Sequence, residues 1–511
     1  MVETVDALAK LVGAEHVLAG GAGADGGLED YTHDECLTVA PVSPAAVVKP
    51  GSAEEVAAVV RWAAEHGIGV TARGSATGLS GGCIPNPGGI VVSFERMNAI
   101  VDIDTANHVA VVQPGVTLHQ LDEATAVHGL IYPVFPGESS ASLGGTVATN
   151  AGGMRAIRYG VTRHHVLGLQ AVLASGQIIR TGGKVVKSSS GYDLTHLLVG
   201  SEGTLALITE ATLKLHPRLA QRATVLAPFA TLAQVTAAVP RIVDAGLSPL
   251  MLEYIDMLTM AAATEAAGLD LGIPPEVRDR ALAYLVVVLE GAHDDRLQAD
   301  VEVCGELLGV LDAIDVYVLP PTAADDLIKA RERAFFVAKA SGADDIVDVV
   351  VPRAAIARYL AEVAELGAEH GALVAGCGHA GDGNVHLSIF QPDAERRRRL
   401  LRAVFAAGVA LGGAISGEHG LGRAKQDYFV ELEDPVKLQL LRAIKQVFDP
   451  QGILAPGLAL PDPAQTRLAQ AGAAQAGPAA AGPAAAGAAP AGPAPAGPAA
   501  ASAGAVPRGA A

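Results

Sequence analysis

The residues best suited to chemistry lie in two short glycine-rich segments of the C-terminal half. His379 and His386 flank a glycine turn in GHAGDGNVH, and SGEHGLG places Glu418 beside His419. A turn at residues 381–383 would fold the two imidazoles toward one point. Two imidazoles and one carboxylate with an open position form the ligand set of a catalytic metal site. We therefore predict a divalent metal ion, zinc or a similar one, held by His379, His386 and Glu418.

The same residues suggest a reaction. A cation that holds the hydroxyl and carboxylate oxygens of a 2-hydroxy acid would lower the pKa of the hydroxyl group. A neutral histidine beside it could accept the hydroxyl proton. Arg331 or Arg333, in KARER, could pair with the substrate carboxylate through two parallel hydrogen bonds. The simpler alternative, surface histidines near turns, would be favoured for one histidine but not for four clustered His and Glu residues.

Two further glycine-rich runs precede this cluster, ARGSATGLSGG at 72–82 and PGESSASLGGTVATNAGGMRAIRYG at 136–160. Glycines without a Cβ let the backbone approach a flat, bulky partner. The N–H groups of the first run could form an anion-binding concavity. We expect the second run to be too rich in small polar residues to build a core. Together the runs predict a large, phosphate-bearing cofactor, and two loops without a ligand are the alternative.

Composition excludes several classes of function. The chain has 511 residues, half of them hydrophobic, which suits two or three domains. A net charge of −18 without an extended basic stripe argues against a nucleic-acid partner, and RRRR at 396–399 reads as a solvated helix face. Four scattered cysteines without a Cys-x-x-Cys pair predict neither a disulfide framework nor an iron–sulfur site, and favour a cytoplasmic protein.

The sequence also predicts no direct membrane span. The N-terminal segment MVETVDALAKLVG lacks the pattern of a signal peptide, and the longest aliphatic run, from Ala281, is too short for a bilayer. A peripheral position at the inner membrane would therefore require a partner.

The elements that must position these residues follow from periodicity. A short strand at 46–50, a helix that Ser52 caps and Gly67 ends, and a strand at 68–74 lead into the first glycine run. Mixed strands and helices continue to about residue 217, and longer elements follow. The segment 373–390 is expected to form two strands joined by the glycine turn, with a helix at 393–411. The fold class is therefore α+β.

Six segments together resemble the motifs of a known family. They are ARGSATGLSGG, PGESSASLGGTVATNAGG, RYGVTRHHVLG, GSEGTLALITEATLKLHP, GHAGDGNVH and GEHGLG. They resemble FAD-dependent D-2-hydroxyacid dehydrogenases of the vanillyl-alcohol oxidase and p-cresol methylhydroxylase (PCMH) fold, and most of all the FAD-binding subunit of glycolate oxidase. The resemblance covers about residues 35–457.

The resemblance implies a PCMH-type FAD-binding domain of two subdomains and an α+β cap domain of the FAD-linked oxidase C-terminal type. We divide the chain accordingly. The parts are an N-terminal helical segment (1–35), the FAD-binding domain (36–218), the cap or substrate domain with the metal site (219–440), a segment returning to the FAD domain (441–461) and a disordered Ala/Pro/Gly-rich tail (462–511).

The resemblance also implies site residues. His379, His386 and Glu418 would be metal ligands and His419 the catalytic base, while Arg331 and Asn384 are assigned to substrate binding. The expected FAD contacts are Arg73, Gly74, Ser75, Ala76, Thr77, Gly78, Leu79, Ser80, Pro136, Gly144, Gly145, Thr146, Asn150, Gly152, Gly153, Gly203 and Ile208.

Two departures from the family pattern refine these expectations. Relatives that tether FAD covalently carry His about where Thr77 stands, so a non-covalent FAD is expected. Relatives that act on 2-hydroxyglutarate carry Lys where alignment back from Pro352 places Ile346, which favours a small substrate, glycolate or D-lactate. An electron acceptor or an electron-transfer subunit would reoxidise the flavin. The number of associating chains stays open, a homodimer included.

Other functions remain open from the sequence. A D-lactate dehydrogenase with a cytochrome or quinone acceptor would carry the same motifs. A metal-dependent hydrolase could use the three ligands to activate water and would lack flavin absorption. A non-catalytic flavin-binding subunit would have no use for the Glu418–His419 pair. The sequence contains no strand-anchored Gly-x-Gly-x-x-Gly, which argues against NAD as the acceptor.

Overall fold

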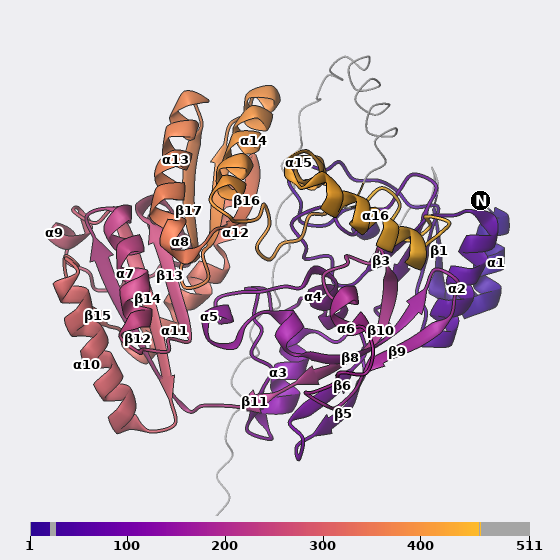
Figure 1. The fold of residues 1–511 in the computed structure, drawn as a ribbon, viewed down its shortest axis with the longest axis horizontal. Helices are drawn as coiled ribbons and strands as arrows, with labels where there is room; N and C mark the ends of the chain where they lie inside the picture. The colour runs from indigo at the N-terminus through magenta and orange to yellow at the C-terminus, as the bar shows by residue number, and fades with distance from the viewer. Residues whose placement is uncertain (1, 21–26, 459, 461–511) are drawn as a thin grey trace, which may run out of the picture. The chain divides into compact units, whose positions relative to one another are not determined.

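The structure, a computed structural model, describes residues 2–20, 27–458 and 460 (Figure 1). The predicted tail at 462–511 lies outside the described residues. Across the described part of the chain, no helix combines the length and the apolar character that crossing a bilayer requires.

The domain that is expected to bind FAD, called the FAD domain below, has as its first subdomain a four-stranded sheet covered by α1 and α2. The strand order is β1-β2-β4-β3, with β2, β4 and β3 parallel and β1 antiparallel. Ser52 caps α2 by accepting a hydrogen bond from Glu55 N, and Gly67 ends the helix in the left-handed region, as the sequence predicts. The elements are α1 (Val2–Val12), β1 (Val17–Ala19), β2 (Ala46–Val48), α2 (Ala53–His66), β3 (Val70–Arg73) and β4 (Ile90–Ser93).

The second subdomain is a five-stranded antiparallel sheet of order β5-β6-β10-β8-β9. Its elements are β5 (Ile100–Asp104), β6 (Val109–Val112), α3 (Leu118–Ala126), β7 (Leu130–Ile131), α4 (Leu143–Thr149), α5 (Ala156–Tyr159), β8 (Val166–Leu173), β9 (Ile178–Gly182), α6 (Leu194–Leu198), β10 (Ala206–Lys214) and β11 (His216–Pro217).

One sequence-based expectation is wrong here. The glycine-rich run at 136–160 contributes to the core, because α4 turns Leu143 and Val147 into it, and both are fully buried. Ser142 caps this helix by accepting from Gly145 N. The run is therefore part structural element and part loop.

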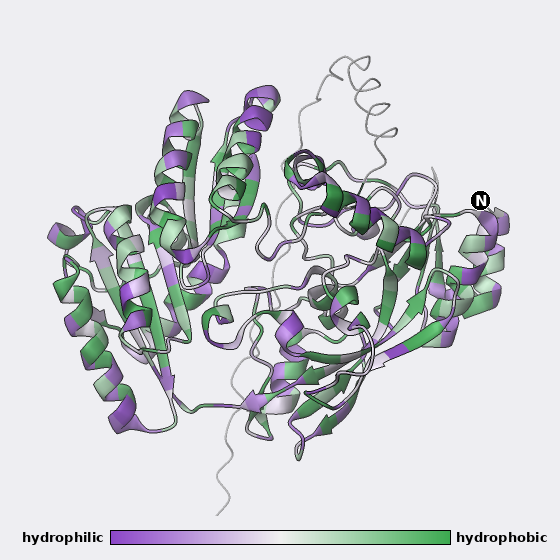
Figure 2. Ribbon diagram, viewed as in Figure 1, coloured by the Kyte–Doolittle hydropathy of each residue, from purple (hydrophilic) through white to green (hydrophobic). Residues whose placement is uncertain are grey.

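The cap is a seven-stranded antiparallel sheet of order β15-β12-β14-β13-β17-β18-β16. Helices α7, α10, α13 and α14 pack on one face, and α8 and α11 pack on the other. Figure 2 shows the expected pattern, with green strands inside and helices striped green and purple.

The cap strands are β12 (Gln221–Phe229), β13 (Met251–Asp256), β14 (Ala283–Gly291), β15 (Tyr317–Val318), β16 (Asp345–Val350), β17 (Leu373–His379) and β18 (Asn384–Phe390). The helices of this half are α7 (Leu232–Asp244), α8 (Met257–Ala267), α9 (Pro275–Arg278), α10 (Asp294–Val310), α11 (Pro321–Glu332), α12 (Ala334–Ala340), α13 (Ile356–Glu369) and α14 (Ala394–Ala410). The predicted hairpin at 373–390 is thus confirmed as β17 and β18.

Strand periodicity decides which cap residues share a face. Residues such as Val347 and Val385 point into the core beneath α13 and α14. Their neighbours in sequence must point to the opposite face, because successive side chains of a strand alternate. The register sets His379 opposite Glu253, and His386 opposite both Cys377 and Asp348. Four adjacent strands therefore present polar side chains on one face.

After the cap the chain returns to the FAD domain. Helix α15 (Gln426–Leu432) lies against α14, whereas α16 (Pro435–Phe448) packs Ile444 and Phe448 on the second subdomain. Leu454 then pairs with Val70 beside the first sheet. The division placed between residues 440 and 441 falls inside α16.

Asp449 holds the returning segment against the end of α16. Its buried carboxylate accepts from Ile453 N at 3.0 Å and Leu454 N at 2.8 Å, and it pairs with Lys445. Asp449→Ala should lower the free energy of unfolding by about 2–3 kcal/mol, because two buried N–H groups and one ammonium lose their partner. The measurement is the denaturation midpoint in urea. Asp434→Ala, at the exposed N-cap of the same helix, is the control and should cost about 1 kcal/mol; equal effects would contradict the assignment.

Candidate functional site

The two glycine-rich runs meet in one cavity of the FAD domain. Most of the expected FAD contacts line it: every residue from Arg73 to Ser80, then Pro136, Gly144, Gly145, Thr146, Gly203 and Ile208. The polar groups and exposed backbone of these residues suit a large cofactor with phosphates.

Ser142 joins the two runs. Its Oγ accepts from Gly145 N in its own helix and from Ser75 N in the first run, both at 3.3 Å. A Cβ at Gly74 would lie 2.0 Å from this oxygen, so only glycine allows the approach. The glycine pattern of the sequence therefore reflects packing of one loop on the other as well as room for a ligand.

Three expected contacts lie outside this cavity. Asn150 ends α4 in the left-handed region, and its Oδ1 accepts from Arg163 N. Gly153, at φ +117°, has no room for a Cβ because Phe135 O would lie 1.8 Å away. A Cβ at Gly152 would lie 2.8 Å from Oε2 of Glu418. The missing side chain of this glycine therefore leaves room for the Glu418 carboxylate, which comes from the other domain. Each of the three has a structural role where it stands.

His379, His386 and Glu418 come together on the polar face of the cap sheet. Nε2 of His379 lies 3.1 Å from Oε1 of Glu418, and Nε2 of His386 lies 3.2 Å from the same oxygen. One ligand atom from each residue falls within 4.8 Å of the other two. The three donors therefore converge from β17, β18 and the loop after α14. We call these three residues, together with the adjacent His419, the cluster.

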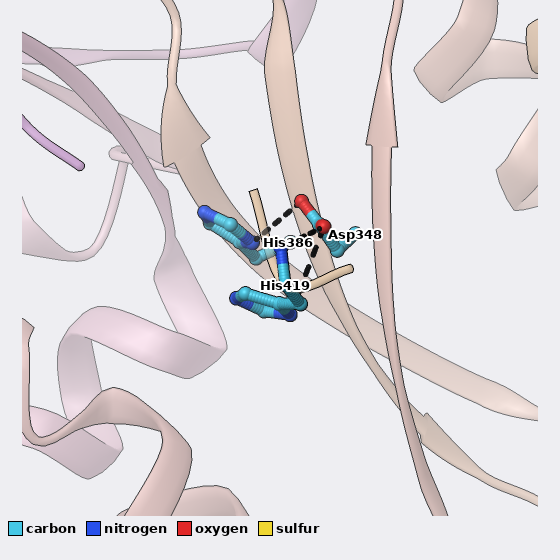
Figure 3. A group of neighbouring side chains, drawn as sticks. All are labelled: Asp348, His386 and His419. Atoms are coloured by element: carbon cyan, nitrogen blue, oxygen red, sulfur yellow. Dashed lines mark hydrogen bonds and ion pairs between the residues drawn. The ribbon is translucent and has the colours of Figure 1, made fainter. Parts of the chain in front are cut away.

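Carboxylates stand behind both histidines. Nδ1 of His379 lies 2.7 Å from Oε1 of Glu253, and Nδ1 of His386 lies 3.7 Å from Oδ1 of Asp348. Figure 3 shows Asp348 beside the stacked rings of His386 and His419, whose centroids are 5.0 Å apart. A carboxylate hydrogen-bonded to a histidine, as Glu253 is to His379, fixes the tautomer and ring orientation of a metal ligand. Asp348 is too far from His386 Nδ1 for a hydrogen bond and acts on this ring through its charge. The donor set and its supports thus fit a divalent metal ion.

The charges of the cluster also fit a cation. Burial alone would lower the pKa of His379, but Glu253 and Glu418 outweigh it and raise this pKa to about 10. Burial would raise the pKa of Glu418, but His379 and His386 hold it well below its usual range. The carboxylates of the site are therefore stabilised by a positive charge beside them, which either a proton on His379 or a metal ion can supply.

Two carboxylates, the buried Asp348 and the half-buried Glu202, hold the loop that carries Glu418 and His419. Oδ2 of Asp348, from the cap, accepts from the backbone N of residues 417, 418 and 419 at 2.8–3.1 Å, and from the hydroxyl of Ser416. Glu202, from the FAD domain, accepts from Leu421 N and Gly422 N at 2.9 Å each. The loop is thereby fixed between the two domains.

The predicted substrate-binding residues differ in their placement. Arg331 borders the cluster, and its Nη2 lies 3.0 Å from Oε2 of Glu253. Its Nε has no hydrogen-bond partner among the described residues although it is buried. Asn384 turns away, donating to Asp348 Oδ1 at 2.7 Å, and Arg333 is exposed. Arg331 remains the residue available to a carboxylate.

Sequence reasoning missed Glu253 and Asp348. Each is an acid in the interior of an otherwise apolar strand, MLEYID or DIVDVV, whose second acid stands at the strand end, and each is buried. A buried carboxylate requires a partner, so an acid within such a strand is itself a signal. Their partners depended on strand register, which the sequence did not supply.

Comparison with known proteins identifies both domains. Residues 44–182 match the family model described as "FAD binding domain", and residues 218–458 match "FAD linked oxidases, C-terminal domain".

Several relatives match over most of their length. The chain is 56% identical to an uncharacterised FAD-linked oxidoreductase of Mycobacterium tuberculosis, covering 90% of this chain and 100% of the relative. It is 38% identical to D-lactate dehydrogenase of Anaerostipes hadrus, covering 84% and 92%. It is 35% identical to glycolate oxidase subunit GlcD of Bacillus subtilis, covering 83% and 91%.

The fold is that of the PCMH family. The structure of p-cresol methylhydroxylase with bound substrate superposes with a TM-score of 0.74 at 19% identity, covering 90% of this chain and 97% of that chain.

The convergence of three donors generates a test of metal binding. Glu418→Gln should reduce the divalent metal content of the purified protein to near zero, because the remaining histidines offer two ligands instead of three. Metal content is measured by elemental mass spectrometry and bound flavin by absorbance, which should persist. The exposed His119→Ala is the control. Metal retained at wild-type level in Glu418→Gln would refute the ligand assignment.

Proposed function

The chain belongs to the family of FAD-linked oxidoreductases that contains the D-lactate, glycolate and D-2-hydroxyglutarate dehydrogenases, and from this premise we propose that it oxidises a 2-hydroxy acid to the 2-oxo acid. The substrates to test first are glycolate and D-lactate. A second carboxylate, as in 2-hydroxyglutarate, would meet the uncharged Ile346 in the cavity beside the cluster.

The main support for the proposal is that the cluster lies between two cavities. The cavity of the glycine-rich runs and a second cavity under the cap share Leu79, Pro136 and Gly137 on the FAD side. They also share Glu418 and His419 on the cap side. A substrate held at the cluster would thus face a cofactor in the first cavity.

FAD, when bound, supplies the acceptor for the hydride that leaves the substrate carbon. A divalent ion held by His379, His386 and Glu418 would supply positive charge against the substrate's oxygens. Arg331 would bind the carboxylate through its unpartnered Nε, with Glu253 fixing the guanidinium from behind.

His419 is proposed as the base. Burial lowers its pKa to about 4 although the charge of Asp348 opposes this, so the imidazole is neutral near pH 7 and can accept the hydroxyl proton. Asp348 binds the backbone N of His419 at 2.8 Å and thereby positions it. The electrons would pass from the flavin to an acceptor other than NAD or to an electron-transfer subunit.

His419→Ala tests this role. The variant should retain FAD and metal, while the rate of anaerobic flavin bleaching by substrate falls by about 10²–10⁴-fold, the usual contribution of a general base. Stopped-flow absorbance of the flavin measures the rate, with His119→Ala as the control. A wild-type bleaching rate in His419→Ala would exclude it as the base.

The flavin is proposed to be non-covalent, since Thr77 lines the first cavity where covalent relatives carry His. Acid precipitation should therefore leave all the flavin absorbance in the supernatant. A yellow pellet that survives washing would contradict this expectation.

A further inference from the structure

The second cavity extends well beyond the cluster, and its far part is apolar. The whole cavity measures about 410 Å³, within the range typical of sites for drug-sized ligands and far more than the six heavy atoms of lactate need. The portion at Leu79, Pro136 and Gly137 adjoins the cofactor cavity. The remainder runs along the cap sheet away from His379 and His386.

Strand register gives the direction of this extension. Asp348, His386 and Cys377 are cross-strand neighbours at the cluster. Two residues along each strand, Ile346, Ser388 and Ala375 form the next row on the same face. The third row pairs Phe390 with Leu373. Each row lies roughly 7 Å beyond the last, so the cavity floor continues roughly 13 Å past the cluster.

Helices α8 and α12 form the opposite wall. They pack against each other, and α8 also packs against β17. We call the space between these helices and the second and third rows the apolar arm. It is lined by Leu258, Ala262, Val337, Ile346, Ala375 and Phe390. Leu258 and Leu373 also line the cavity and are 44% and 54% exposed, which marks the end open to solvent.

The arm carries no charge. The charged residues lining the cavity are Arg331, Glu332 and the cluster itself, all at its inner end, and the polar groups elsewhere are hydroxyls and a thiol, such as Ser388 and Cys377. A second anionic or cationic group on the substrate would therefore lose its hydration without a partner. A hydrocarbon chain would instead gain by leaving water.

We propose that the substrate is a 2-hydroxy acid with a long or bulky apolar side chain, whose head binds at the cluster and whose hydrocarbon part fills the apolar arm. This rests on the proposed function and specifies its substrate class. The reaction is unchanged: the carbon bearing the hydroxyl loses a hydride to FAD and the hydroxyl loses its proton, giving the 2-oxo acid. Glycolate and D-lactate would then be minimal substrates that leave the arm empty.

A homologous series tests the proposal in the wild-type holoenzyme. Anaerobic reduction of bound FAD is followed by stopped flow with D-lactate, D-2-hydroxybutyrate, D-2-hydroxyhexanoate and D-2-hydroxyoctanoate. The second-order rate constant should rise by about two- to fourfold per added methylene, the upper value being full burial of each group. A constant that is flat or falls along the series overturns the proposal.

A matched pair of variants locates the effect. Ala262 lines the arm and Ala261, its neighbour on α8, is exposed. Ala262→Phe should reduce the ratio of the octanoate to the lactate constant by at least tenfold, whereas Ala261→Phe should leave it at the wild-type value. An unchanged ratio in folded Ala262→Phe, judged by flavin content and thermal melting, excludes the arm as the chain-binding site.

The outcomes separate this inference from the function on which it rests. Failure of every 2-hydroxy acid to reduce the flavin would reject the proposed function. Reduction by D-lactate without gain from longer chains would reject only the substrate class. A flat series combined with faster reoxidation by quinones of longer tail, lost in Ala262→Phe, would assign the arm to the electron acceptor and also overturn the proposal.

Discussion

The site depends on one short loop held from two sides by carboxylates. Asp348 of the cap binds the backbone around Glu418 and His419, and Glu202 of the FAD domain binds the next turn at residues 421 and 422. Each carboxylate exchanges hydration for charge-assisted bonds to N–H groups, which are the stronger class of hydrogen bond. The loop cannot shift toward one domain without losing its bonds to the other. Both the third predicted ligand and the predicted base take their positions from this arrangement.

Much of the framework could be predicted from the sequence because it rests on local rules. The capped helix at 53–66 and the hairpin at 373–390 follow from periodicity and turn residues, and the hairpin brings His379 to His386. The expectation for the glycine-rich run at 136–160 was wrong, because two core-forming residues one turn apart are enough to bury one side of a short helix even among glycines. Leu143 and Val147 supply that side.

The parts that could not be predicted are those that depend on register between distant strands. Glu253 lies 126 residues from His379 in the chain, and the pair forms only because β13 and β17 align as they do. The same holds for Asp348 and the loop it binds. Asn384 is the opposite case. Its strand position places it on the polar face, as its assignment to substrate binding requires, but its side-chain amide donates to Asp348 instead. From the sequence, Ile346 indicated only that a second substrate carboxylate would lack a positive partner. Its place in the lining of the apolar arm follows only from the register of the sheet.

The closing segment after the cap has a consequence for biosynthesis. Val70 exchanges backbone hydrogen bonds with Ile453 and Ala455, so the edge of the first sheet is completed by residues made near the end of the described chain. Domains generally fold as units while the ribosome extends the chain. In this chain the edge strand of the first sheet therefore stays unpaired while more than 200 residues of the cap are synthesised and fold. Translation speed through the cap thus sets how long that open edge is available to chaperones or to mispairing.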